Sequence, residues 1–265
     1  MNMTNHRILI GSVLKPVNDS RMYEKIGKSL SLLPNTEIHI AGLKTSIKNE
    51  SNIYFYPIFC GSRMSIFRFF APWKFLIRAL KVKPHTIIVS THELLIVTYL
   101  YKILFGCQFI YDVQENYYHN ILYTDAFPSL IKPIIARWVR LKERVAKKRM
   151  DGYLLAEKIY LTELSDRIQE PNLVLENKYV GIVPTSKEIV PIKDLPKIKL
   201  LYSGTIATSY GVFEAIDLAI RLHVFNRKFE LTIIGFAPDC RELTKVKNRI
   251  NPFPFIKLIS GNAPI

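Results

Sequence analysis

The sequence predicts an α/β protein with two Rossmann-like, doubly wound domains, of which the second is incomplete. Two observations support this prediction. Short apolar runs typical of buried parallel strands alternate with segments of helical periodicity along most of the chain. The alternation pauses at a stretch with three prolines, residues 183–196, and then restarts. We therefore expect a first domain over residues 1–183, a linker over 184–197 and a partial second domain over 198–265.

The first domain contains strand-like runs rich in Ile, Val, Leu and Tyr, as expected for strands buried on both faces. These runs are Arg7–Gly11, Glu37–Ala41, Ile53–Ile58, Thr86–Ser90, Gln108–Val113, Gly152–Ala156 and Asn172–Glu176. The main helical segments between them are Ser20–Leu33, Ile66–Leu80, Leu94–Phe105 and Pro133–Arg149. Strands joined by helices predict a parallel sheet covered on both faces.

The same alternation continues after the linker. The expected strands are Lys199–Ser203, Phe229–Gly235 and Phe255–Ile259. The expected helices are Val212–Phe225 and Arg241–Arg249. These elements predict the beginning of a second parallel sheet.

Composition narrows the class of protein. Of the 265 residues, 49% are hydrophobic, which supports a sizeable core and excludes a disordered chain. The three cysteines form no CxxC pair, so neither a disulfide framework nor a zinc knuckle is expected. The longest apolar segment, Leu94–Phe105, is shorter than the ~20 residues needed to cross a bilayer. We expect a cytoplasmic protein without a signal peptide or a membrane-spanning helix.

The chain is strongly basic, with a formal net charge of +15. Residues 60–150 contain 15 Lys and Arg against 5 Asp and Glu, and cations alternate with aromatic residues over 63–81. This pattern predicts docking on an anionic membrane surface. The alternative is that the aromatic side chains face the core and the charges are simply solvated. Nucleic acid is not expected as a partner, because no standard binding module is present.

A Gly-containing turn over residues 203–211 connects a predicted strand to a predicted helix. The N–H groups of such a turn and the N-terminus of the following helix attract phosphate. The residues that we expect to bind a nucleotide-type diphosphate here are Ser203, Gly204, Thr205, Tyr210 and Gly211. The alternative is an ordinary turn of a doubly wound domain, because a single Gly-containing turn is a weak signal.

Five segments resemble those of a known family. They are KPVNDSRMYEK (Lys15–Lys25), STHELL (Ser90–Leu95), YDVQENYYHN (Tyr111–Asn120), YSGTIATSYGVFEAI (Tyr202–Ile216) and the hinge-like NLVLENKYV (Asn172–Val180). In order and spacing they resemble the GT-B fold glycosyltransferases, and among these the retaining family 4 (group 1) enzymes of bacterial polysaccharide synthesis. The resemblance implies transfer of a sugar from a nucleotide-sugar donor to a lipid-linked or saccharide acceptor, with retention of configuration.

The resemblance also implies a UDP- or GDP-sugar as substrate, no bound cofactor and no essential metal. His92 does not begin a zinc-binding HExxH motif, because position 96 is Ile. Asn177 joins the turn residues as an implied donor contact. Relatives often carry an Arg and a Lys in the donor turn, whereas Thr205, Ser209 and Tyr210 are uncharged. A lipid-linked acceptor would place the protein at the inner face of the membrane.

Ligands of open α/β sheets bind beyond the carboxyl ends of the strands. Gly11, His92, Gln114 and Asn177 each follow a predicted strand, so we expect them along one edge of the first sheet, facing the second domain across a cleft. The residues that we expect to contact the acceptor are Gly11, Lys15, Asp19, Arg21 and His92. An equally good interpretation of residues 15–21 is a solvated loop in which Asp19 caps a helix.

Gln114 and Glu115 are the candidate catalytic residues. Relatives often have a His at the position of Gln114, which helps to place the transferred sugar. Gln114 can hydrogen-bond but cannot hold a proton near neutral pH. Glu115 could orient the acceptor or act as a general base; the alternative is that it caps the following segment or pairs with a cation. The resemblance implies no obligatory nucleophile, since the leaving diphosphate takes the acceptor proton.

The segment after Pro196 contains fewer βα units than the roughly six of a complete domain of this kind. We therefore expect a fragment of a longer enzyme or a shortened, inactive one. A second hypothesis is a non-catalytic remnant that binds a membrane or a partner through its basic first domain. A third is a sugar-nucleotide epimerase of the same fold, which would need acid/base carboxylates and a His that the sequence does not bring together.

Overall fold

The structure of the protein is a computed structural model, and its described residues are 5–60, 66–123, 127–178, 191–237 and 239–261. The chain divides into two compact units, Met1–Val180 and Gly181–Ile265, and each is described by itself. The first half of the predicted linker, residues 184–190, lies outside the described residues.

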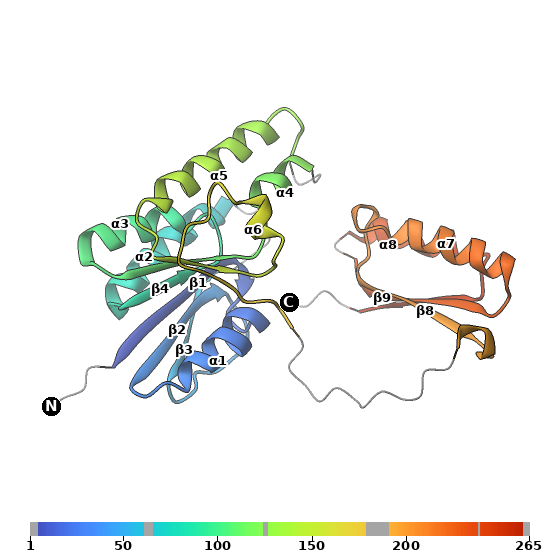
Figure 1. Ribbon diagram of the computed structural model, residues 1–265, viewed down its shortest axis with the longest axis horizontal. Coiled ribbons are helices and arrows are strands. Elements are labelled where there is room, and N and C mark those ends of the chain that lie inside the picture. The colour runs from blue at the N-terminus through green and yellow to red at the C-terminus, as the bar shows by residue number, and fades with distance from the viewer. Residues whose placement is uncertain (1–4, 61–65, 124–126, 179–190, 238, 262–265) are drawn as a thin grey trace. The chain divides into compact units, whose positions relative to one another are not determined.

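A parallel sheet forms the centre of the first unit (Figure 1). Its strand order is β3-β2-β1-β4-β5-β6-β7, so the chain starts in the middle, runs to one edge and then returns to build the other half. The strands are β1 (His6–Pro16), β2 (Thr36–Leu43), β3 (Ile53–Phe59), β4 (Thr86–Val89), β5 (Gln108–Val113), β6 (Gly152–Leu155) and β7 (Asn172–Val174). The direction of growth reverses between β1 and β4, where ligands of such sheets bind.

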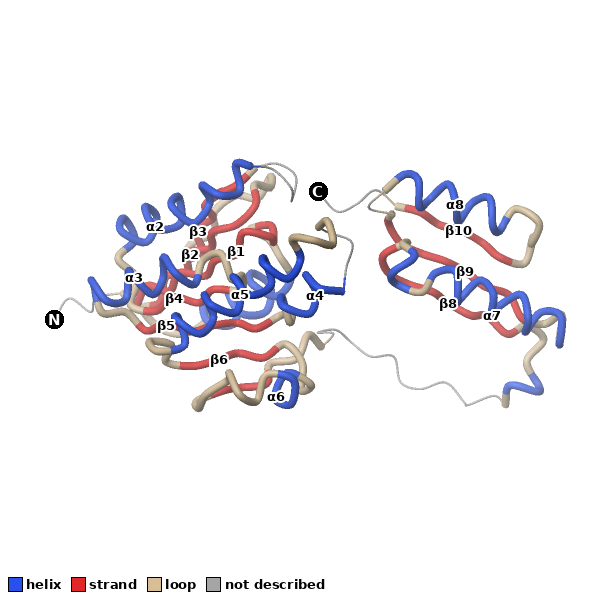
Figure 2. Tube along the Cα trace, turned by 90° about the horizontal axis from the view of Figure 1, so that it is seen from above, coloured by secondary structure: helices blue, strands red, loops and turns tan. Residues whose placement is uncertain are grey.

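Helices cover both faces of this sheet (Figure 2). One face carries η1 (Ser20–Gly27), which is wound as a π-helix and continues into α1 (Lys28–Ser31). The other face carries η2 (Ile66–Phe70), α2 (Ala71–Val82), α3 (Leu95–Phe105), α4 (Tyr117–Tyr123), α5 (Lys132–Lys147) and α6 (Tyr160–Glu163). Contacts join α2 to α3 and α3 to α5, so these three helices form one layer.

The alternation of side chains along β1 explains the two cores. Leu9 and Val13 are buried with residues of α2 and α3, whereas Ile8 and Ile10 are buried with residues of η1. Successive residues of a strand point to opposite faces, so a strand covered on both sides must be apolar throughout. The continuous apolar runs of the sequence therefore predicted central strands correctly.

Gly11 does not follow the first strand, as we expected, but lies inside it. β1 continues to Pro16, where it pairs again with β2 after an irregularity in the register. A Cβ atom at Gly11 would lie 2.2 Å from Cε2 of Phe75 on α2, so the glycine permits close packing of helix and strand. Gly11 is buried, and its contact with an acceptor stays a prediction.

The second unit contains a three-stranded parallel sheet in the order β10-β9-β8. Its strands are β8 (Ile198–Thr205), β9 (Phe229–Phe236) and β10 (Ile256–Ser260), and its longer helices are α7 (Val212–Phe225) and α8 (Cys240–Ile250). Two short 3₁₀ turns are η3 (Ile192–Asp194) and η4 (Thr208–Tyr210). Both longer helices lie on the same side of this sheet in Figure 1, over a core that includes Val212, Ile216 and Ile233.

The predicted α/β class and the two parallel sheets are confirmed. α4 was not predicted, because the run Tyr117–Tyr123 is short and lacks a clear apolar stripe. Within the described ranges, no helix combines the length and the apolar character that a membrane span requires.

Candidate functional site

The carboxyl ends of the parallel strands gather polar side chains at one edge of the first sheet. Asp112 lies near the end of β5, Ser90 follows β4, and Leu175 follows β7. The loop that leaves β1 leads directly into η1, so Arg21 reaches the same edge. Residues far apart in the sequence meet here, as expected at a topological switch point.

Arg21 and Asp112 form a buried ion pair at this edge. Nη2 of Arg21 lies 2.6 Å from Oδ1 of Asp112, and their side chains are 3% and 0% exposed. Nε of Arg21 lies 3.0 Å from both carboxylate oxygens. Ser90 Oγ donates to Asp112 at 3.1 Å, while Nη1 of Arg21 donates to the carbonyl of Leu175 at 2.5 Å and to Oδ1 of Asn177 at 3.1 Å. The pair therefore joins the segments that follow β1, β4 and β7 to β5.

This network accounts for three of the predicted site residues. Arg21, expected to contact an acceptor, donates to Asp112 and two other protein groups, and its contact with an acceptor stays a prediction. Asn177, an expected donor contact, accepts from Arg21. Gln114 donates from Nε2 to Oδ2 of Asp112 at 2.7 Å, and the backbone carbonyl of Gln114 accepts from Oη of Tyr160 at 2.9 Å. Catalytic and donor-binding roles for Gln114 and Asn177 stay predictions.

The loop after β1 follows the capping alternative. Oδ1 of Asp19 accepts from the backbone N–H groups of Arg21 at 2.9 Å and Met22 at 3.0 Å, which caps η1. Lys15 lies within the last residues of β1, where it is half-buried. For both residues, contact with an acceptor stays a prediction.

Glu115 lies in the loop between β5 and α4. Its Oε2 accepts from Nδ2 of Asn120, a residue of α4, at 2.9 Å. Tyr117 ties the same helix to the neighbouring strand, because its Oη donates to the carbonyl of Ser90 at 3.0 Å. A catalytic role for Glu115 stays a prediction.

His92 contacts a lysine that we did not predict as a site residue. Nδ1 of His92 lies 2.8 Å from Nζ of Lys142 on α5, and the imidazole packs edge-on against Tyr117 with ring centroids 5.0 Å apart. Burial, followed by the positive charge of Lys142, lowers the pKa of His92 to about 2. Burial also lowers the pKa of Lys142 to about 8. At neutral pH, Nδ1 of His92 is therefore an unprotonated acceptor for the ammonium group.

A sequence signal for Lys142 exists. The buried residues of α5 are Ala136, Val139, Lys142 and Ala146, which recur at helical spacing on one face. A lysine in an otherwise apolar stripe interrupts the amphipathic pattern, and buried lysines are rare unless they have a partner. That interruption would have marked Lys142 as a candidate.

The second unit places the predicted phosphate turn between β8 and α7. Gly211 has a φ of 77°, a left-handed conformation that favours glycine, and it directly precedes the first residue of α7. No side chain of the described residues caps this helix. The first N–H groups of an α-helix have no partner within the helix, so they are available to an anion.

The other residues of the turn lie at or near the surface. Ser203 and Gly204 are exposed residues of β8, Thr205 ends that strand half-buried, and Tyr210 is 65% exposed. Oη of Tyr202 donates to the carbonyls of Thr205 at 2.8 Å and Tyr210 at 3.1 Å, which holds the two ends of the turn together. Phosphate binding by these residues stays a prediction.

Metal ligands and thiols do not gather at either place. In the ranges that the structure describes, no three His, Cys, Asp or Glu side chains lie together in a way that could hold a metal ion. Cys60 and Cys240 are exposed, and Cys107 is buried, which raises the pKa of its thiol to about 11.

Comparison with known proteins gives structural matches only. No protein-family model and no curated protein sequence matches the chain. Sucrose-phosphate synthase from Thermosynechococcus elongatus has a TM-score of 0.66 at 13% identity, over 98% of this chain and 71% of that chain. Anabaena HepE in complex with UDP and glucose has a TM-score of 0.62 at 11% identity, over 98% and 70%. The catalytic domain of Arabidopsis thaliana starch synthase IV, bound to ADP and acarbose, has a TM-score of 0.59 at 10% identity, over 98% and 75%.

The chain has the GT-B fold. At these sequence identities the similarity extends to the fold alone. The matches include the Rickettsia africae glycosyltransferase, with a TM-score of 0.61 at 13% identity over 98% of this chain and 69% of that one. Membership of family 4 stays a prediction.

The His92–Lys142 contact predicts a pH dependence of stability. Unfolded His92 takes up a proton near pH 6.5, whereas the folded residue stays neutral down to about pH 2. The unfolded state therefore binds more protons in this window, and stability falls as the pH falls below 6.5. We expect wild type to lose about 2 kcal/mol from this group between pH 7 and pH 5, and His92→Gln to lack that loss.

Urea unfolding at pH 7 and pH 5 measures the difference. His119→Gln, which changes an exposed histidine of α4, is the matched control and should keep the wild-type dependence. An equal loss of stability on acidification in His92→Gln and wild type would contradict the assignment.

Proposed function

We propose that the protein is a glycosyltransferase that takes a sugar from a nucleotide-sugar donor, with UDP- or GDP-sugars as the donor class. The observation that carries the proposal is the uncapped N-terminus of α7 after the left-handed Gly211, beside the three-stranded parallel sheet of the second unit. Structures of similar fold were solved with UDP, UDP-glucose or ADP, which supports a nucleotide as the ligand.

The first unit would supply the acceptor side. His92, Gln114 and Glu115 lie at the carboxyl edge of its sheet, and the acceptor class that we propose is a lipid-linked or saccharide hydroxyl. We propose that the sugar is transferred with retention of its configuration. In this transfer, the bond between the sugar and the diphosphate breaks, and the leaving diphosphate takes the proton of the acceptor hydroxyl. In that mechanism Gln114 positions the sugar and Glu115 orients the acceptor.

The turn that we propose for the donor lacks positive charge, which also supports the hypothesis of a non-catalytic protein. Thr205, Ser209 and Tyr210 bring no positive charge, and Glu214 in the first turn of α7 opposes an anion there. A diphosphate would rely on backbone N–H groups and hydroxyls. A non-catalytic protein that binds a membrane or a partner through the first unit is therefore the alternative function.

Calorimetric titration of the protein with UDP, GDP and ADP tests the donor site. We expect binding of at least one nucleotide, and we expect Glu214→Gln to tighten it about two- to fivefold by removing a negative charge beside the α7 N-terminus. Glu230→Gln, at the start of β9, removes a carboxylate away from that turn and should leave affinity unchanged. Absence of binding to all three nucleotides would remove the donor-site proposal, and an unchanged affinity in Glu214→Gln would remove its assignment to α7.

We also propose that the first unit docks on the inner face of an anionic membrane. The layer of α2, α3 and α5 exposes large apolar side chains, among them Trp73, Ile77, Leu104, Ile134 and Trp138. Exposed cations such as Lys74 and Lys81 lie on the same helices. The aromatic side chains of α2 thus fall into two groups: Phe75 is buried in the core, whereas Trp73 is 60% exposed. An apolar surface bordered by cations is typical of proteins that bind at the lipid interface.

The chain provides a natural probe of this docking, because its two tryptophans, Trp73 and Trp138, are both exposed on this layer. We expect vesicles of phosphatidylcholine with phosphatidylglycerol to shift their fluorescence to the blue, and pure phosphatidylcholine vesicles to do so much less. Removing two cations with Lys74→Ala and Lys81→Ala should weaken binding roughly thirtyfold, at about 1 kcal/mol per charge.

The matched control is Lys247→Ala with Lys257→Ala, which removes two exposed cations from the second unit. It should bind vesicles as wild type does. Equal weakening in both double variants, or no response to anionic vesicles, would contradict docking through the first unit.

A further inference from the structure

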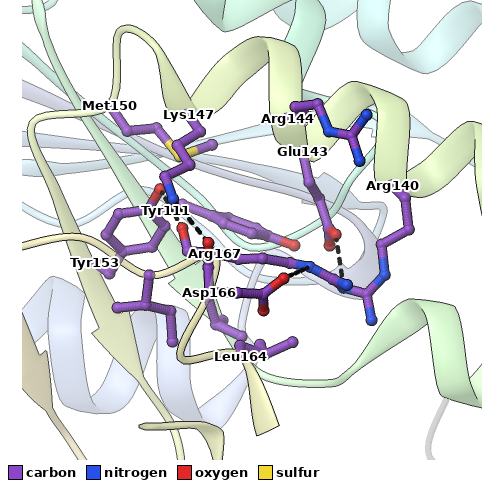
Figure 3. A pocket seen from close by; sticks show the side chains of 12 residues that line it. Tyr111, Arg140, Glu143, Arg144, Lys147, Met150, Tyr153, Leu164, Asp166 and Arg167 are labelled. Carbon is purple, nitrogen blue, oxygen red and sulfur yellow. Dashed lines mark hydrogen bonds and ion pairs between the residues drawn. The ribbon is translucent and has the colours of Figure 1, made fainter. Parts of the chain in front are cut away.

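A cavity lined by both apolar and charged side chains lies under α5 in the first unit (Figure 3). It has a volume of about 190 Å³ and is bounded by β5, β6, the second half of α5 and residues 164–168. One water molecule takes up about 30 Å³ of the liquid, so the cavity has room for a small polyatomic ion. It is smaller than the roughly 300 Å³ at which pockets for drug-sized ligands begin.

The lining of the cavity is rich in positive charge. Its cations are Arg140, Arg144, Lys147 and Arg167, and its carboxylates are Glu143 and Asp166. Burial raises the pKa of Glu143, which favours its neutral form and further weakens the negative contribution. The surroundings therefore favour an anion over a cation.

Three hydrogen-bond donors in the lining have no partner among the described residues. They are Oη of Tyr111, Nε of Arg140 and Nη1 of Arg167, and each of these atoms is buried. Arginine nitrogens can only donate, and a tyrosine hydroxyl donates as well as accepts. Leaving buried donors unpaired costs stability, so the arrangement needs acceptors from outside the chain. An oxyanion carries several acceptor oxygens and is a ligand that such donors suit.

We propose that this cavity binds a phosphate-type oxyanion, with Tyr111, Arg140 and Arg167 donating to its oxygens. The carboxylate of Asp166 favours hydrogen phosphate, which can also donate a proton, over sulfate, which carries none near neutral pH. Glu143 already accepts from Arg140 at 3.1 Å, and Asp166 accepts from Nε of Arg167 at 3.2 Å, so both carboxylates also orient the guanidinium groups. The proposal does not depend on nucleotide-sugar chemistry.

Arg167 is the residue to change. Arg140 also donates to Oδ1 of Asn116 at 3.3 Å and stacks over Tyr118, so its loss would disturb the loop before α4. Among the described residues, the side chain of Arg167 donates to the neighbouring Asp166, and the bond from Oη of Tyr153 goes to the backbone carbonyl of Arg167, which a substitution keeps. Arg167→Met keeps an unbranched apolar stem and removes the charge and the donors.

Tyr111→Phe is the second variant, and it separates binding from folding. It removes a buried hydroxyl that has no partner, so in phosphate-free buffer the variant should melt at a higher temperature than wild type. The same change removes a donor to the anion, so the variant should bind phosphate more weakly. Opposite effects on the two measurements are expected only if the hydroxyl serves a ligand.

Calorimetric titration of the whole chain with sodium orthophosphate measures the site. We expect Arg167→Met to weaken binding about tenfold or more, Tyr111→Phe to weaken it a few-fold, and sulfate to bind less well than phosphate. Arg149→Met, which removes an exposed cation just beyond α5 and outside the lining, should bind as wild type does.

Methyl phosphate as a second probe distinguishes two sources of the ligand. Binding as tight as that of orthophosphate indicates a phosphoryl group carried by a larger molecule, whereas loss of binding indicates the free anion, and both support the site. Absence of phosphate binding to wild type, or binding that neither Arg167→Met nor Tyr111→Phe weakens, would overturn the proposal.

Discussion

The buried ion pair between Arg21 and Asp112 is the interaction on which the polar edge of the first sheet depends. A charge taken out of water is tolerated only when a partner and further hydrogen bonds satisfy it. Here Ser90, Leu175 and Asn177 complete the shell around the pair. Because the partners come from the ends of different strands, the pair sets how those ends sit relative to one another.

This arrangement also decides which polar groups are available to a ligand. Arg21 is engaged with Asp112, His92 contacts Lys142 of α5, and Glu115 accepts from Asn120. The two anion sites that we propose use different chemistry: backbone N–H groups at Gly211, and guanidinium groups beneath α5.

Much of the fold could be predicted because it rests on local patterns. Runs such as Thr86–Val89 and Gln108–Val113 are apolar on both faces, and that property alone places them inside a parallel sheet. Asp19 could be predicted as a helix cap, because an aspartate side chain accepts hydrogen bonds from the first backbone N–H groups of a helix.

The rest could not be predicted, because it depends on contacts between distant residues. The sequence contains no sign that Arg21 turns inward to meet Asp112, since a basic residue in a polar loop is usually solvated. Gly11 resembled the end of a strand, although Phe75 of α2 packs against it. Lys142 did leave a signal, but the high number of cations on α5 concealed it.

A double-mutant cycle on Arg21 and Asp112 tests this account most directly. We expect Arg21→Met and Asp112→Ala each to lower the free energy of unfolding by about 3–5 kcal/mol, because each leaves a buried charge without its partner. The double variant should lose less than the sum of the two by at least about 2 kcal/mol, measured by urea unfolding at pH 7. Losses that add to within about 0.5 kcal/mol would show that the two residues act independently and would contradict the central role of the pair.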